Sequence, residues 1–73
     1  MQNRGKEAWF IVLVIRQFAS RYSLKVPDAY EYLAKYQAID FLERHYNYEH
    51  TLGIEEILDN VTQLCIKNGG TLK

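Results

Sequence analysis

The chain has 73 residues, a formal net charge of zero and a single cysteine. This length allows one domain at most, and one cysteine excludes both an internal disulfide and a cysteine-based zinc site. Apolar burial must therefore stabilise the fold, and the composition, which is 48% hydrophobic, provides for it. We expect one helical domain over 1–73, with frayed ends at 1–4 and 71–73.

The charges are unevenly distributed along the chain. Residues 1–25 carry five basic residues and one acidic residue, whereas the rest of the chain carries four basic and eight acidic residues. The two halves can attract each other or a second copy. Five cations over this length are too few for a typical nucleic-acid footprint, so we expect no nucleic acid as the main partner.

The first predicted element is a helix over 5–22. The apolar run Ala8–Ile15 could by itself be a buried strand, but apolar residues continue with helical spacing as far as Tyr22. The run is too short for a membrane span, which needs about 20 residues, and Arg16-Gln17 follows it where a signal peptide would carry small residues. These features predict a cytoplasmic protein without a membrane segment.

The predicted first helix is apolar on more than one face. We expect its inward stripe to consist of Ala8, Ile11, Val12, Ile15, Phe18, Ala19 and Tyr22. This assignment leaves four large side chains outside the stripe, and soluble monomers avoid such patches. We therefore expect a homodimer with this helix at its seam and candidate interface residues Trp9, Phe10, Leu13 and Val14.

Two shorter helices are predicted next, over 26–36 and 38–46. Pro27 suits a first helical turn. No glycine or proline separates the two segments, so they could also form one bent element. A polar loop is expected over 47–53, before a last helix over 54–68 that begins after Gly53 and ends at Gly69-Gly70. The predicted fold class is all-α, a compact bundle of about four helices.

His45 and His50 are the first candidates for chemistry, but their spacing argues against a metal site. Helical metal pairs are three or four residues apart, whereas these two are five apart. We interpret His45 as a cation at a helix end. We expect His50 and Thr51 to fix the loop before the last helix, so that His50→Ala lowers stability by about 1–2 kcal/mol, the usual cost of removing one partner from a buried hydrogen bond.

Neither a nucleophile nor a phosphate-binding loop can be recognised. Cys65 lies on the predicted core face of the last helix, where a thiol is inert. Ser20 and Ser23 are at a helix end, with ordinary capping roles. We expect no enzymatic activity, no catalytic residues, no metal and no cofactor.

The tyrosines are either core residues or interface residues. Tyr30 and Tyr36 are expected in the core, with each hydroxyl reaching the surface. Tyr32 and Tyr48 are the better candidates for an interface, because tyrosine is enriched at contact centres.

Residues 36–51 resemble a bacterial family of small proteins, the domain of unknown function thirty-seven ninety-one. The similarity extends over nearly the whole chain, although Gly53 stands where a serine-like cap is usual. The resemblance implies no established activity, but it implies an association with toxin-type ADP-ribosyltransferase-like domains. The most specific residues are Asp40, Phe41, Leu42, His45, Tyr46, His50 and Thr51.

The sequence thus favours a non-enzymatic protein-interaction module. It could be an accessory or antitoxin-like partner of a toxin-type enzyme. The alternative is a small dimeric nucleic-acid-binding regulator, whose contacts would come from Arg4, Lys6, Arg16, Arg21 and Lys25.

Overall fold

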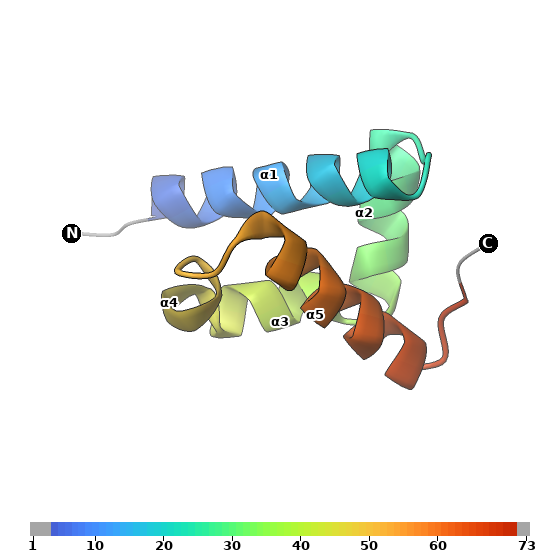
Figure 1. The fold of residues 1–73 in the computed structure, drawn as a ribbon. Coiled ribbons are helices and arrows are strands. Elements are labelled where there is room, and N and C mark those ends of the chain that lie inside the picture. Colours follow the sequence, from blue (N-terminus) through green and yellow to red (C-terminus); the bar gives the residue numbers. More distant parts are fainter. Residues whose placement is uncertain (1–3, 72–73) are drawn as a thin grey trace.

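The computed structural model describes residues 4–71, and all regular structure within them is helical (Figure 1). Of the frayed ends predicted at 1–4 and 71–73, residues 1–3 and 72–73 lie outside the described residues, whereas Arg4 begins a helix and Thr71 has no regular structure. The all-α fold is confirmed, and no strand replaces the apolar run of the first segment. The helices are α1 (Arg4–Arg21), α2 (Val26–Lys35), α3 (Ala38–Arg44), α4 (Tyr46–Glu49) and α5 (Ile54–Lys67).

Helix α2 leads from the end of α1 to the start of α3, so that α1 and α3 form two sides of the fold (Figure 1). Helix α5 contacts both of them. The buried residues form one core cluster from α1, α2, α3 and α5, namely Phe10, Val14, Ile15, Phe18, Ala19, Ala29, Leu33, Ala38, Leu42, Ile57, Leu58, Val61 and Cys65.

The inward face of α1 differs from the predicted stripe. Phe10 and Val14, predicted as interface residues, are buried in the core, whereas Ala8 and Val12, predicted to face inward, are exposed. Residues four apart share a helix face, so Phe10, Val14 and Phe18 turn inward together. This rotation buries Phe10 and Val14 in place of Ala8 and Val12, which removes more apolar area from water.

The second and third helices are separate elements, because the chain turns sharply at Gln37. Its φ of 69° is left-handed and ends α2 without a glycine. The Tyr36 carbonyl accepts a hydrogen bond from Asn68 Nδ2 at 2.8 Å, which ties this turn to the end of α5.

The predicted helix over 38–46 and the loop over 47–53 are both partly wrong. Helix α3 ends at Arg44, and His45 caps it with φ −110° and ψ 23°. The chain then forms the short helix α4, which begins at the last residue of the predicted helix and extends into the segment predicted as a loop. This arrangement places the Tyr46 ring edge-on against Phe10, 5.4 Å between centroids. This aromatic contact joins the start of α4 to the core.

Candidate interaction surface

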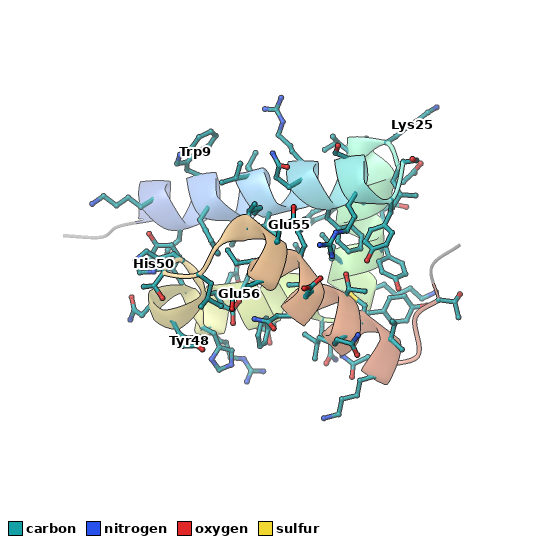
Figure 2. All side chains as sticks on the ribbon, viewed as in Figure 1. Trp9, Lys25, Tyr48, His50, Glu55 and Glu56 are labelled. Carbon is teal, nitrogen blue, oxygen red and sulfur yellow. The ribbon has the colours of Figure 1, made fainter. Side chains whose placement is uncertain are left out.

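An apolar patch remains exposed along α1 and the start of α2. We call it the α1–α2 face and define it as Trp9, Val12, Leu13, Val26 and Tyr30. Trp9 is 64% exposed and Tyr30 is 50% exposed. Figure 2 shows Trp9 on the side of α1 that points away from the rest of the fold. Trp9 and Tyr30 are the large aromatic side chains of this patch.

The α1–α2 face contains an open groove of about 560 Å³. The groove forms where the first turn of α2 lies against the middle of α1. Pro27 is at this turn, so its missing backbone N–H leaves no unpaired donor there. Arg16 provides a charge in an otherwise largely apolar lining. The lining residues are Val12, Ile15, Arg16, Val26, Pro27 and Tyr30.

In the structure, some of the predicted interface residues are exposed and others are packed inside the fold. Trp9 and Leu13 are exposed on the α1–α2 face, and Tyr48 is 64% exposed on α4, apart from that face (Figure 2). Phe10 and Val14 are core residues. Tyr32 is half-buried, and its ring stacks on Phe18 with centroids 5.8 Å apart. Tyr32 therefore contributes mainly to packing.

Sequence reasoning missed Val12, Val26 and Tyr30 as surface residues. One feature of the sequence could have indicated that Val12 is exposed. Val12 shares a helix face with Trp9 and Arg16, and an arginine on a face indicates that this face is exposed to solvent. Tyr30 was expected in the core, and no comparable signal marks it as exposed.

Arg21 connects the positive and negative halves of the chain. Its guanidinium donates hydrogen bonds to Glu55 and Asp59 at the start of α5, the latter at 2.8 Å. The bonds to Glu55 and then to Asp59 raise the pKa of Arg21. Next to this pair, the Tyr22 and Thr62 hydroxyls form a hydrogen bond of 2.9 Å. The opposite charges of the two halves are thus partly paired within one chain.

His50 and Thr51 bind the backbone of α4. His50 Nδ1 lies 2.6 Å from the Tyr46 carbonyl oxygen, and its ring stacks on the Tyr46 ring with centroids 4.5 Å apart. The Thr51 hydroxyl donates to the Tyr48 carbonyl at 2.6 Å. Thr51 thus closes α4, and it does not cap α5, which has Gly53 at its N-cap. Both side chains are exposed.

We predict that His50→Ala lowers the free energy of unfolding by about 0.5–1 kcal/mol, the lower part of the range for one hydrogen bond. This is less than the value expected from the sequence, because water replaces the lost partner at an exposed site. Urea unfolding followed by circular dichroism measures the change. A loss above about 2 kcal/mol would contradict the exposed geometry.

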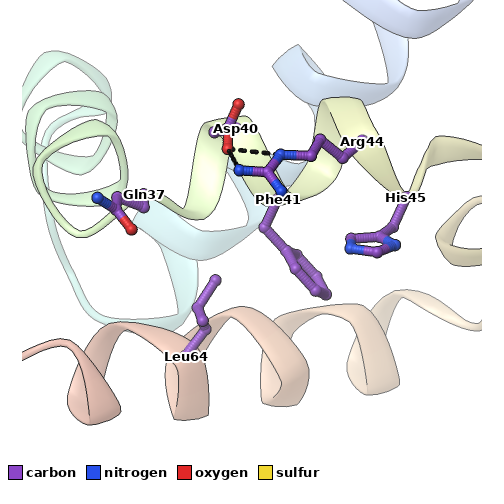
Figure 3. A pocket seen from close by; sticks show the side chains of 6 residues that line it. All are labelled: Gln37, Asp40, Phe41, Arg44, His45 and Leu64. Atoms are coloured by element: carbon purple, nitrogen blue, oxygen red, sulfur yellow. Dashed lines mark hydrogen bonds and ion pairs between the residues drawn. The ribbon is translucent and has the colours of Figure 1, made fainter.

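His45 belongs to a small polar pocket of about 150 Å³ between α3 and α5 (Figure 3). Its ring packs against Phe41, with centroids 4.8 Å apart. Arg44 in this pocket pairs with Asp40 at 2.8 Å, so its charge is already compensated. The lining is completed by Gln37 and Leu64. No three His, Cys, Asp or Glu side chains within residues 4–71 are grouped so that they could hold a metal ion.

Cys65 and Tyr32 are two protonated groups in apolar surroundings. Burial raises the pKa of the Cys65 thiol to about 11, so little of it is thiolate at neutral pH. Desolvation likewise raises the pKa of Tyr32. The Tyr32 hydroxyl is buried and has no hydrogen-bond partner within the described residues. Neither group is prepared for nucleophilic chemistry.

Glu49 is a buried carboxylate that sequence reasoning missed. It is 2% exposed, at the end of α4, and Asn60 Nδ2 lies 3.3 and 3.4 Å from its two oxygens. This contact joins α4 to α5. Its position in a segment predicted as a polar loop gave no sign that it would be buried.

The comparisons with known proteins give one family. No curated protein and no solved structure is found to match the chain. A family model described as "Protein of unknown function (DUF3791)" matches residues 9–68. This match covers all of α2 to α5 and most of α1, and it confirms the resemblance stated from the sequence. The chain belongs to this family of unknown function.

Proposed function

We propose that the domain is a non-enzymatic protein-interaction module that binds its partner through the α1–α2 face. The observation that carries this proposal is the exposure of Trp9 and Tyr30 beside an apolar groove. Covering apolar surface contributes about 25 cal/mol per Å². Tryptophan and tyrosine are also the side chains most enriched at the energetic centres of protein interfaces.

A protein partner fits this surface better than a nucleic acid does. Phosphate backbones are bound mainly by free lysine and arginine side chains. Arg21, one of the five basic residues considered for such contacts, is already bonded to Glu55 and Asp59. The α1–α2 groove has Arg16 as the one charged residue in its lining.

The partner class follows from two considerations. The family resemblance supports an accessory or antitoxin-like role next to a toxin-type ADP-ribosyltransferase-like protein. The exposed apolar side chains of the α1–α2 face support a homodimer. A cytoplasmic location is part of the proposal, in keeping with Cys65 being free and buried. No helix within residues 4–71 has the length and hydropathy of a membrane span.

The test is capture of partners from cells that produce the protein, with identification by mass spectrometry. Tagged wild type is compared with Val26→Glu, which places a charge in the groove. The matched control is Ile66→Glu, at a 49% exposed position on α5. We expect partners retained by the wild type and the control to be lost with Val26→Glu. Equal retention by all three proteins would contradict the proposed surface.

A further inference from the structure

The exposed residues of α1 are spaced symmetrically about a point in the middle of the helix. From the midpoint between Val12 and Leu13, Trp9 and Arg16 are equally distant, as are Gly5 and Ser20. All six residues are exposed. At 3.6 residues per turn they lie on one strip along the helix, with Val12 and Leu13 on either side of its centre line. A strip of this kind can pair with a copy of itself.

We infer that the α1–α2 face is occupied by a second copy of this chain, with the two α1 helices antiparallel and the two-fold axis between Val12 and Leu13. This inference rests on the proposed function and names the partner of the same face. A two-fold contact uses the same patch on both subunits, so each residue at one distance from the axis meets its counterpart.

The residues that meet across this axis are chemically complementary. Trp9 of each copy lies level with Arg16 of the other, and a guanidinium is attracted to the face of an indole ring. Val12 meets Val12 of the second copy, and Leu13 meets Leu13. At both ends Gly5 faces Ser20, so small residues let the helices approach closely. A parallel pairing would instead place the two Arg16 side chains together.

The groove adds a second point of fit. Arg16 lines the groove, so in this register the Trp9 side chain of the second copy lies at the groove, next to Val26 and Tyr30. Both α2 helices then lie on the same side of the α1 pair and extend the contact. An aromatic side chain buries about 150–250 Å² in such a pocket.

The exposed strip is short, so the expected dimer is a weak one. A stable interface buries about 800 Å² on each partner. Helix α1 has 18 residues and is about 27 Å long at 1.5 Å per residue, and the apolar side chains that it shares with α2 on this face are five. We therefore expect dissociation in the micromolar range, which sedimentation can follow.

The test combines sedimentation velocity of the full chain at ~1–100 μM, which spans micromolar dissociation constants, with oxidative cross-linking. The wild type should sediment as a dimer at the highest concentration. Leu13→Glu places two carboxylates at the axis and should weaken the dimer by more than about 30-fold, the loss typical of a central interface residue. Arg16→Glu should weaken it less, and Ile66→Glu should leave it unchanged.

Cross-linking tests the register. Leu13→Cys should form a disulfide-linked dimer, because the two Leu13 positions meet at the axis. Gln17→Cys, also exposed on α1 but away from the axis, should not. The wild type controls for Cys65, which is buried.

Each contrary result overturns a defined part of the inference. A monomeric wild type at ~100 μM, well above a micromolar dissociation constant, overturns the second copy as occupant. The capture experiment then tests the proposed function separately. A dimer that persists in both Leu13→Glu and Arg16→Glu overturns the α1 interface. Cross-linking through Gln17→Cys overturns the antiparallel register.

Discussion

Phe18→Ala is expected to lower the free energy of unfolding by about 3–5 kcal/mol, the range for removing a large aromatic side chain from a core. Phe18 is fully buried, and its ring lies 4.8 Å from that of Tyr22 and 5.8 Å from that of Tyr32. The substitution removes these aromatic contacts and leaves a cavity between α1 and α2. A domain of 73 residues has roughly 4–11 kcal/mol of stability in total. The variant should therefore be close to unfolding.

Urea unfolding followed by circular dichroism measures this loss. The matched control is Tyr48→Ala, which also removes an aromatic side chain but at a 64% exposed position. It should change the free energy of unfolding by less than about 1 kcal/mol, as surface substitutions do. Equal losses in the two variants would contradict the assignment of Phe18 to the core.

Gly70→Ala is expected to lower the free energy of unfolding by about 1–3 kcal/mol, the usual cost of overpacking. A Cβ atom at this buried position would lie 2.5 Å from the Tyr32 hydroxyl oxygen and 3.0 Å from the Cys65 carbonyl oxygen. The Tyr32 ring cannot easily withdraw, because it packs between Phe18 and Tyr36. Gly53→Ala is the control, since a Cβ there meets nothing within 4 Å.

A second substitution identifies the cause of that loss. Tyr32→Phe removes a buried hydroxyl that has no partner, so by itself it should be neutral or stabilise by up to about 1 kcal/mol. In the Gly70→Ala background it should recover part of the lost stability. Contacting residues that share a clash couple by about 0.5–3 kcal/mol, and a double-mutant cycle measures this term. Strict additivity would contradict the contact.

The helical periods of α2 and α5 were strong enough in the sequence to predict both helices to within one residue. The pair Gly69-Gly70 was predicted to end the last helix, and Gly69 provides the left-handed residue there, with φ 102°. The sequence did not show why Gly70 follows it, because the need for space comes from Tyr32, which is distant in the chain. Local patterns report local conformation, whereas contacts across the fold require its tertiary arrangement.

The α1–α2 face was predictable only in part, because it too depends on contacts between helices that are distant in the sequence. Trp9 and Leu13 were predicted as surface residues and are exposed, but α1 is apolar on so many sides that periodicity alone does not define its rotation. The rotation is defined by which residues of α1 pack into the core, among them Phe10, whose ring contacts Tyr46 of the unpredicted helix α4. Val26 and Tyr30 become part of the same surface only because α2 lies against the middle of α1.

Trp9 is the single tryptophan of the chain, so its fluorescence reports directly on the α1–α2 face. The measurement is the emission maximum of the full chain on dilution from ~100 μM to ~0.5 μM, which crosses a micromolar dissociation constant. If a second copy covers Trp9, emission shifts to longer wavelength on dilution, Leu13→Glu emits at long wavelength throughout, and Ile66→Glu behaves as the wild type. Emission that stays at long wavelength for all three proteins at every concentration would contradict the account.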